Sequence, residues 1–370
     1  MKIAIDAREL RGQPTGVGRY LAKLLAEWPH LPEAAPHEFI NVAPPSDAKV
    51  AGTLWEQITL PRLAREAGAE VLFAPAYSGP VFSSVPMVVT IHDVSFAAHP
   101  EWFGWREGVR RRATVRLAAR AAEHVITVSE FSKREIVGHF GLDPSKITVV
   151  YEGVTTFATG AKSDTTPTAA SSSQRTVLFV GSIFNRRHVP ELIEGFARLA
   201  LAHPELQLEI VGDNRTLPHV NVDAIIRESG MSGRVHIRSY VSDEQLQRLY
   251  ADASAFAFLS EYEGFGLTPL EALASGVPVV LLDTPVAREI CGDAATYVTR
   301  PDPSLIEHAL NAVLYDVRER ERILDAAKRV LGRYSWHECA ARVLDVLVES
   351  GRRGAERAGM GRSRSAPDAG

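Results

Sequence analysis

Short apolar, β-branched runs alternate with longer helical patterns along most of the chain, and the alternation occurs in two blocks. In the first block the expected strands are residues 2–6, 39–43, 71–75, 87–93, 124–129 and 147–153. In the second they are residues 175–182, 206–213, 234–240, 255–260, 277–283 and 295–299. Continuous apolar strands separated by helices are typical of parallel sheets that are covered on both faces. The pattern therefore predicts two doubly wound α/β domains.

The segment between the two blocks, residues 154–174, is rich in Ser, Thr, Ala and Gly and predicts a linker or solvated loop. It separates a first domain, 1–153, from a second, 175–335, with a cleft expected between them. The helix at 336–349 is expected to pack back on the first domain. Residues 350–370 contain no core-forming residues, which predicts a disordered tail, either simply solvated or making a basic contact with a partner.

Composition narrows the class of protein. A chain of 370 residues suits about two domains, and its net charge of −4 argues against general nucleic-acid binding. The N-terminal apolar run is interrupted by Asp6 and Arg8, which excludes a signal peptide, and no run approaches the ~20 apolar residues of a membrane span. Cys291 and Cys339 lie outside any metal-ligand spacing, which indicates buried thiols in a reducing compartment. A cytoplasmic protein is expected.

Glycines and polar residues follow several of the expected strands. In open α/β sheets, ligands lie outside the carboxyl ends of strands. The residues found at those ends are Asp6, His92, Gly181, Gly212 and Glu263. These strand ends are therefore the places to look for a functional site.

The stretch EYEGFGLTPLEALASGVPVV (261–280) contains two glutamates, Glu263 and Glu271. Glu263 precedes a Gly-Phe-Gly turn and a helix start, which suits close approach of the backbone to an anionic ligand. Thr268, Pro269 and Glu271 fit a capping box with proline at the first helical position, and Gly276 is expected to end that helix. Glu271 thus has a local structural explanation beside a binding role.

Two arginines, Arg186 and Arg187, stand on a strand-to-helix loop in GSIFNRRHVPELIEGF (181–196). Guanidinium groups match the oxygens of a diphosphate, although a solvated surface pair is the alternative. The glycine loop DARELRGQPTGVGRY (6–20) matches neither G-x-G-x-x-G nor G-K-[ST], but could bring amides to a phosphate. A lone histidine such as His92 is more often structural than catalytic. No G-x-S-x-G, H-E-x-x-H or suitably placed D-x-D accompanies it, which disfavours hydrolases and metalloenzymes.

Taken together, these stretches resemble the family 4 retaining glycosyltransferases, which have the GT-B fold. YEGFGLTPLEALASGVPVV resembles the family's E-x7-E signature. PTGVGRY, IHDVSFAAHPEWF, ITVSEFSKREI and VVYEGV resemble the branch that contains mannosyltransferases of polysaccharide assembly. The resemblance covers nearly the whole chain. It implies an α/β protein of the GT-B type, with two Rossmann-like doubly wound domains facing a cleft, the first on the acceptor side and the second binding the nucleotide sugar.

The resemblance also implies roles for the matching residues of the second domain. Glu271 would hold the ribose hydroxyls, and Glu263 would bind hydroxyls of the donor sugar. Arg186 and Arg187 would neutralise the diphosphate. Amides would line the sugar and phosphate pocket at Gly264, Phe265 and Gly266, and the strand ends at Gly212 and Tyr240 would flank the base.

In the first domain, the resemblance implies that Gly16 brings its amide to the phosphate and that His92 approaches the sugar near the reacting carbon. Ser129 matches a serine that the family places near the cleft. The catalytic set implied is His92, Arg186, Arg187 and Glu263. Three positions depart from the family pattern, which usually has Lys at Arg187, Asn at His188 and often Gly at Ser239.

The expected activity is retaining transfer of a hexose, with mannose from GDP-mannose as the preferred donor, to a glycan or lipid-linked saccharide in cell-surface polysaccharide synthesis. No metal or other cofactor is expected, because arginines and a helix N-terminus can stabilise the departing diphosphate. Two alternatives stay open: a nucleotide-sugar epimerase of the same fold, and a nucleotide-sugar-binding protein without catalysis. Oligomeric state is not predicted.

A basic helix is expected at 102–124, where Arg112, Arg116 and Arg120 share one face. Trp102 and Trp105 stand at its start. Such a helix could rest on the anionic inner face of the plasma membrane, where a lipid-linked acceptor would lie. The alternative is a solvated helix face whose aromatic residues cover the core.

Overall fold

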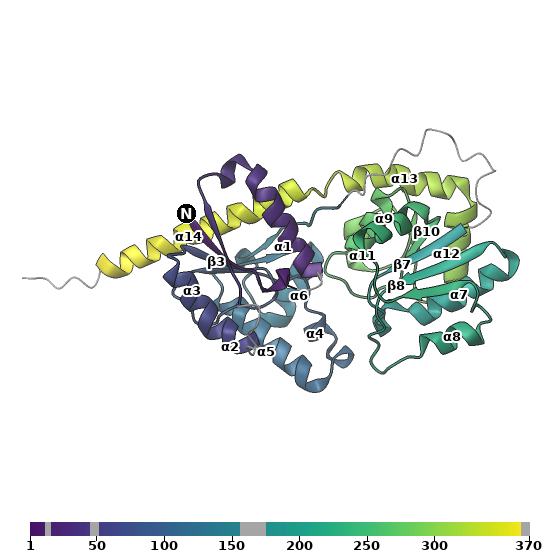
Figure 1. The fold of residues 1–370 in the computed structure, drawn as a ribbon, viewed down its shortest axis with the longest axis horizontal. Helices are drawn as coiled ribbons and strands as arrows, with labels where there is room; N and C mark the ends of the chain where they lie inside the picture. Colours follow the sequence, from purple (N-terminus) through teal and green to yellow (C-terminus); the bar gives the residue numbers. More distant parts are fainter. Residues whose placement is uncertain (12–15, 45–51, 156–174, 364–370) are drawn as a thin grey trace, which may run out of the picture. The chain divides into compact units, whose positions relative to one another are not determined.

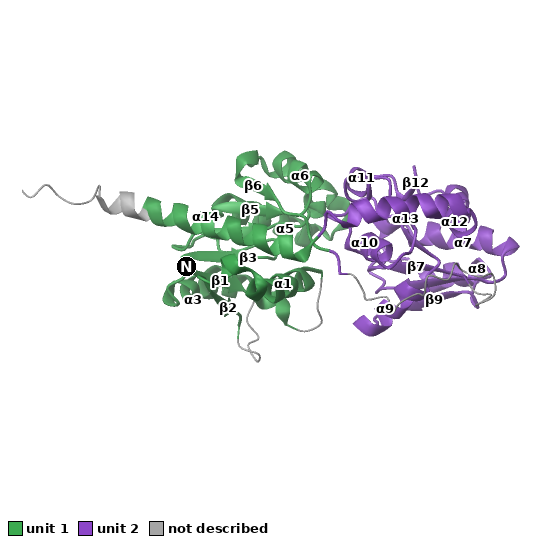
Figure 2. Ribbon diagram, turned by 90° about the horizontal axis from the view of Figure 1, so that it is seen from above, with its two compact units in different colours: residues 1–153, 335–370 green, residues 154–334 purple. Residues whose placement is uncertain are grey.

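The computed structural model describes residues 1–11, 16–44, 52–155 and 175–363 (Figure 1). Contacts divide the chain into two compact units (Figure 2). Unit 1 comprises Met1–Gly153 and Ser335–Gly370, and unit 2 comprises Val154–Tyr334. The predicted linker at 154–174 lies, from residue 156 on, outside the described residues.

Unit 1 is built on a six-stranded sheet in the order β2-β1-β3-β4-β5-β6, and every pairing in it is parallel. All six strands fall within the predicted apolar runs or one residue from them. Their bounds are β1 Lys2–Asp6, β2 Glu38–Val42, β3 Val71–Ala74, β4 Met87–Thr90, β5 His124–Thr127 and β6 Ile147–Val149.

Helices cover both faces of this sheet, because successive strand residues point to opposite sides. Ile3 and Ile5 lie in one core with α1 and α14, whereas Ala4 lies in the other with α3, α5 and α6. The helices are α1 Gly16–Glu27, α2 Gly52–Leu54, α3 Leu60–Glu66, α4 Ser95–Ala98, α5 Trp105–Ala121, α6 Glu130–Phe140 and α14 Trp336–Ser363; a π-helical turn, Trp55–Thr59, joins α2 to α3.

The helix α14 corrects the expectation of a disordered tail at 350–370. It packs in the core of unit 1 and continues to Ser363 (Figure 1), while residues 364–370 lie outside the described residues. The glycines that suggested coil allow close packing instead: a Cβ at Gly351 would lie 2.8 Å from Sδ of Met1, and one at Gly354 would lie 2.6 Å from Cγ of Pro86. Arg357 also forms an ion pair with Glu123.

Unit 2 has its own six-stranded parallel sheet, in the order β12-β11-β10-β7-β8-β9. Together with unit 1, this confirms the predicted doubly wound fold. The strands are β7 Arg175–Val180, β8 Leu206–Val211, β9 Val235–Arg238, β10 Ala255–Phe258, β11 Val279–Leu282 and β12 Thr296–Val298. The helices are α7 Val189–Ala202, α8 Val222–Glu228, α9 Asp243–Asp252, α10 Leu267–Ala274, α11 Pro285–Cys291, α12 Pro303–Tyr315 and α13 Val317–Leu331.

Candidate functional site

In unit 2, the strand order reverses between β7 and β10, which are hydrogen-bonded neighbours although far apart in sequence. Ligands of open α/β sheets bind outside the carboxyl ends of strands at such a reversal. Two loops leave the sheet there: residues 181–188, here named the arginine loop, and residues 259–266, the glutamate loop. The amide of Glu261 donates to the carbonyl oxygen of Arg186 at 2.9 Å, so the two loops are joined through their backbones.

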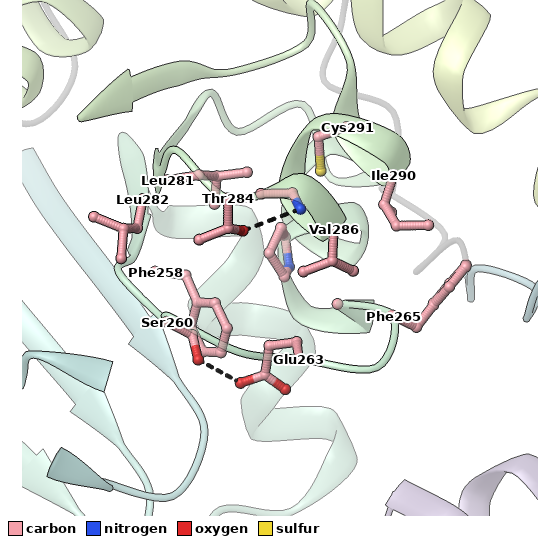
Figure 3. Close-up of a pocket in the computed structure, with 13 residues that line it drawn as sticks. Phe258, Ser260, Glu263, Phe265, Leu281, Leu282, Thr284, Val286, Ile290 and Cys291 are labelled. Atoms are coloured by element: carbon pink, nitrogen blue, oxygen red, sulfur yellow. Dashed lines mark hydrogen bonds between the residues drawn. The ribbon is translucent and has the colours of Figure 1, made fainter. Parts of the chain in front are cut away.

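Arg187 and Glu263 are bonded to each other across these loops. Nε and Nη2 of Arg187 lie 2.9 and 2.7 Å from Oε1 of Glu263, and Ser260 Oγ donates to the same oxygen at 2.8 Å (Figure 3). In the described residues the other oxygen, Oε2, takes no such bond. The side chains are 13% and 22% exposed, so a ligand can reach both. The structure thus brings together the residues predicted to contact the diphosphate and the sugar.

Two glycines make room for this arrangement. Gly181 has φ 145°, and a Cβ there would lie 2.7 Å from Nη1 of Arg187. Gly212 has φ 151°, and a Cβ there would overlap the carbonyl of Gly181. Both positions require glycine because neighbouring backbone or guanidinium occupies the space of a side chain. Gly212 and Tyr240 lie at the carboxyl ends of β8 and β9, and the Tyr240 side chain is 60% exposed.

A pocket adjoins the glutamate loop (Figure 3). Its lining is mostly apolar, with Ser260, Glu263 and Thr284 among the polar members. Cys291 also lines it, and burial raises the pKa of this thiol to about 12. Cys291 is therefore a protonated thiol at neutral pH and not a nucleophile. It and Cys339 are free and buried, as predicted.

The predicted capping box at Thr268 and Glu271 is wrong. The helix α10 begins at Leu267, one residue after Gly266, which has φ 104° and serves as the N-cap without any side-chain cap. Glu271 therefore lies in the second turn, too far along to reach the N-cap amide. Its carboxylate is buried instead, and it accepts a hydrogen bond from the hydroxyl of Tyr250 at 3.0 Å.

The remaining predicted residues of unit 2 lie between these groups. Gly264, Phe265 and Gly266 connect Glu263 to α10. The Phe265 ring meets Tyr334 edge to face, with ring centroids 5.3 Å apart. Arg186 lies over the ring of Phe184 at 4.2 Å. These contacts hold the backbone of both loops in place around Arg187 and Glu263.

In unit 1, His92 is enclosed by protein. Its Nδ1 lies 3.1 Å from Oε1 of Glu152, and its Nε2 lies 3.0 Å from the carbonyl oxygen of Pro75. Burial alone would lower the pKa of His92, but the hydrogen bond and charge of Glu152 and the Pro75 carbonyl outweigh it, and the pKa is raised. Both partners are acceptors, so His92 is held as an imidazolium. Glu152, in the YEGV stretch, is a partner that the sequence analysis missed.

The other predicted residues of unit 1 have local structural roles. Ser129 is fully buried and caps α6, where its hydroxyl accepts from the amide of Ser132 at 3.0 Å. Ser132 in turn donates to the carbonyl oxygen of His92. Gly16 is exposed and begins α1; the preceding residues 12–15 of the glycine loop, Gly12 among them, lie outside the described residues.

The described ranges contain neither a candidate metal cluster nor a helix suited to span a membrane. Among those residues, no group of three His, Cys, Asp or Glu side chains could hold a metal ion. No helix in the same part of the chain is long and apolar enough to cross a membrane.

Two solved structures have a similar architecture. The structure of Alr3699/HepE from Anabaena, in complex with UDP and glucose, has a TM-score of 0.70 at 19% identity and covers 94% of this chain and 100% of that chain. WaaG, described as a glycosyltransferase involved in lipopolysaccharide biosynthesis, has a TM-score of 0.68 at 17% identity and covers 94% and 99%. At these identities the likeness shows the fold, which is GT-B.

Sequence comparison identifies the family. Residues 17–156 match Glycosyltransferase Family 4, and residues 163–330 match Glycosyl transferases group 1. The chain belongs to glycosyltransferase family 4 and is a glycosyltransferase. It is 30% identical over 281 residues to the MMP α-(1→4)-mannosyltransferase of Mycolicibacterium hassiacum (72% of this chain, 66% of that protein). It is 27% identical over 270 residues to O-antigen chain mannosyltransferase B of Escherichia coli (70% and 69%). The matches span about two thirds of each relative.

Proposed function

We propose that this glycosyltransferase moves a hexose, with retention of configuration, from a nucleotide sugar to a glycan or lipid-linked saccharide in cell-surface polysaccharide synthesis. The observation that carries the proposal is the bonded pair of Arg187 and Glu263 at the strand reversal of unit 2. A guanidinium can bind a diphosphate, and the second oxygen of Glu263 can accept from a sugar hydroxyl. One ligand that carries both groups is a nucleotide sugar.

The chemistry requires a bond from the sugar's anomeric carbon to phosphate to break and a bond to the acceptor oxygen to form on the same face. The acceptor proton passes to an oxygen of the departing phosphate. Arg186 and Arg187 stabilise the charge that develops on the diphosphate, so we propose that no metal is required. Glu263 orients the sugar through its hydroxyls. No protein nucleophile takes part in this scheme.

Mannose from GDP-mannose is the donor that we propose to test first. The support comes from relatives named as mannosyltransferases, at 26–30% identity. A glycogen synthase from Mycobacterium tuberculosis and an inositol phosphate glycosyltransferase also match, at 26% and 27%, so the donor test also includes other nucleotide sugars, UDP-glucose among them. Glu271, in α10, is the candidate for holding the ribose, and Tyr250 donates a hydrogen bond to its carboxylate.

The decisive experiment is thermal stabilisation of the purified protein by a panel of nucleotide sugars, with and without a chelator. Binding to the folded state raises the melting temperature by mass action. We expect one donor to stabilise regardless of chelator, and we expect Glu271→Ala to lose that stabilisation. Stabilisation that disappears with the chelator would refute metal independence. No stabilisation by any donor in the folded protein would refute the proposed donor site.

Two alternative functions predict different results with the donor that binds. An epimerase of the same fold would convert its donor with no acceptor present. A binding protein without catalysis would bind the donor but show no turnover, and Glu263→Gln would change no rate. Transfer that requires an acceptor, and that falls in Glu263→Gln, would exclude both.

Unit 1 offers a surface for a lipid-linked acceptor. Trp105, Val109 and Leu117 of α5 are 77%, 43% and 49% exposed. Helical spacing puts them on the same side as four exposed arginines: Arg106, Arg110, Arg116 and Arg120. The alternative is that the aromatic residues at the start of this helix cover the core. Phe103 does so, since it is half-buried against the core of unit 1, but Trp105 does not. Exposed aromatic and basic residues on one helix face suit an anionic lipid surface.

Peripheral contact with the inner face of the plasma membrane is therefore part of the proposal. We expect the protein to sediment with vesicles that contain an anionic lipid, and to be released by salt. Trp105→Ser with Arg116→Gln should abolish sedimentation. Arg248→Gln, an exposed arginine on α9, is the matched control and should have no effect. Equal sedimentation of all three proteins would exclude α5 as the membrane surface.

A further inference from the structure

His188, the last residue of the arginine loop, has an unusual backbone conformation. It precedes α7 with φ 50° and ψ 40°, in the left-handed region. Only His188 and Tyr77 have positive φ among the described non-glycine residues. Asparagine tolerates this region well, and histidine does so to a lesser degree. Histidine at this position adds a side chain that can carry charge.

The side chain of His188 connects the two loops. Its Nε2 lies 2.7 Å from Oε1 of Glu261 in the glutamate loop, and its Nδ1 lies 3.4 Å from Oε1 of Glu191 on α7. The imidazole is only 13% exposed. This contact lies beside the backbone bond from Glu261 to Arg186 and beside the Arg187–Glu263 pair. Three successive links therefore join the arginine loop to the glutamate loop.

The surroundings favour the charged imidazole. Burial alone would lower the pKa of His188, but the nearby carboxylate of Glu191 and the hydrogen bond and charge of Glu261 outweigh it, and the pKa is raised. The same contact lowers the pKa of Glu191, although burial alone would raise it. Arg186 and Arg187 are the cationic neighbours, and Arg187 is matched by Glu263. Below this raised pKa, His188 is an imidazolium between two carboxylates.

We propose that His188 and Glu261 are positioning residues that hold the glutamate loop against the arginine loop, so that Arg187 and Glu263 receive the diphosphate and the sugar of one donor. The inference rests on the proposed donor site. Neither residue needs to touch the donor. Their effect is to keep two ligand-binding side chains, which come from loops 76 residues apart in sequence, at bonding distance before the donor arrives.

This arrangement predicts a pH dependence with a definite sign. The link is complete while His188 is charged, and it weakens as the pH rises through the raised pKa. Donor affinity should therefore fall as the pH rises. A partly exposed ion pair contributes at most about 1 kcal/mol, so the expected loss is about twofold to fivefold in Kd. A nucleotide sugar is the right probe, because its diphosphate has no terminal phosphate that titrates in this range.

The test measures Kd for GDP-mannose and UDP-glucose by titration calorimetry at about pH 6 and about pH 9, which bracket the titration of a histidine with a raised pKa. We expect His188→Asn and Glu261→Gln each to remove the pH dependence and to bind with the weaker affinity at both values. The double variant should bind the donor with the same Kd as either single variant, because the two residues act through one contact. His203→Asn is the matched control, since His203 lies at the other end of α7, 3.5 Å from Glu205.

A second measurement does not depend on any ligand. Hydrogen exchange of the amides at 259–266 in the free protein, corrected for the intrinsic effect of pH, should accelerate about twofold to fivefold with rising pH in the wild type. It should be fast at both pH values in His188→Asn. If neither nucleotide sugar binds the wild type, the proposed donor site fails, and exchange alone decides the inference. An unchanged pH dependence in His188→Asn, of affinity or of exchange, would overturn it.

Discussion

Each unit has a point where the order of its strands reverses, and the two points are filled differently. In unit 1 the reversal lies between β1 and β3, where Arg8 binds two buried carboxylates, Asp6 and Glu56, at 2.6 and 2.7 Å. In unit 2 it lies between β7 and β10, where Arg187 binds one partly exposed carboxylate, Glu263. An arginine enclosed by two carboxylates has its charge matched by protein, whereas Arg187 remains open to a ligand.

This difference indicates that Arg8 stabilises the fold, whereas Arg187 can bind a ligand. Glu56 also accepts from Ser78 at 2.8 Å and from Gln57 at 3.0 Å, so its oxygens are fully engaged by protein. Glu263 uses only one oxygen in its bonds to Arg187 and Ser260. The chemistry of the two clusters is similar, but only the second has an acceptor left for a hydroxyl. Substitutions at matched positions should show this contrast.

The largest expected effect is that of Arg8→Met. It leaves Asp6 and Glu56 buried without their cation, and breaking a buried pair costs about 3–5 kcal/mol of stability. Burial raises the pKa of Asp6, and the hydrogen bond and charge of Arg8 partly oppose this rise. Removing Arg8 should therefore raise the pKa of Asp6 further. Arg187→Met should cost at most about 1 kcal/mol, because water can reach Glu263. Urea unfolding at neutral pH measures both values.

For donor binding, we expect Arg187→Met to have the larger effect and Arg8→Met the smaller one. Arg187→Met should lose the thermal stabilisation by the bound nucleotide sugar, whereas Arg8→Met, tested where it is still folded, should keep it. Equal losses of stability in the two variants would remove the contrast between the two reversal points. Retained donor binding in Arg187→Met would remove the role assigned to unit 2.

A smaller effect is expected at Gly181. A Cβ in Gly181→Ala would displace the Arg187 guanidinium and force an unfavourable φ, which costs about 1–3 kcal/mol. Gly230→Ala is the control, since Gly230 also has positive φ, 72°, but nothing within 4 Å of a Cβ. Both variants should lower the free energy of unfolding, but only Gly181→Ala should weaken donor binding. Calorimetry on the folded variants checks this, and equal donor affinity in both would show that Arg187 does not need the space at Gly181.

Much of the fold follows from local sequence patterns. The apolar runs predict the strands of both sheets, because a parallel strand buried on both faces must be apolar along its length. The same patterns misplace α10 and the tail. Gly266 in a left-handed conformation starts α10 two residues early, and Gly351 and Gly354 serve close packing instead of ending a helix. Glycine patterns cannot distinguish these uses without the neighbouring atoms.

The candidate site is harder to predict than the fold. Arg187 and Glu263 are singled out by their strand ends, but their direct bond joins residues 76 apart. His188 and Glu261 are 73 residues apart, and nothing in either local pattern points to the other. His92 and Glu152 likewise meet only because β4 and the chain after β6 end at the same edge of one sheet. Side-chain partners across loops depend on register and loop conformation, which local periodicity does not specify.

The smallest expected effect is the pH dependence contributed by two histidines of unit 1. The pKa of His92 is raised in the folded state, so its contribution to stability is complete below its ordinary value of about 6.5 and is lost as the pH rises through the raised value. The pKa of His124 is lowered, first by burial and then by Arg353, so its charging penalises the fold at low pH. The two contributions therefore have opposite signs.

Subtracting variant from wild-type stability isolates each contribution. The difference between wild type and His92→Gln should fall as the pH rises above about 6.5, whereas that between wild type and His124→Gln should rise with pH below it. The titratable groups around His92 are Glu152, Asp93, Tyr20, Tyr77 and, through Glu152, Cys339. The pKa values of the two tyrosines and of Cys339 are raised, so these three groups titrate well above this pH range. Glu152→Gln should abolish the His92 slope because it removes the carboxylate that holds the imidazolium. A slope that survives in Glu152→Gln would mean that groups other than Glu152 hold the imidazolium. If the comparison of wild type with His92→Gln shows no slope at all, His92 is not held as a cation in unit 1, and the contrast with the ligand-accessible Arg187 of unit 2 would no longer rest on charge already matched by protein.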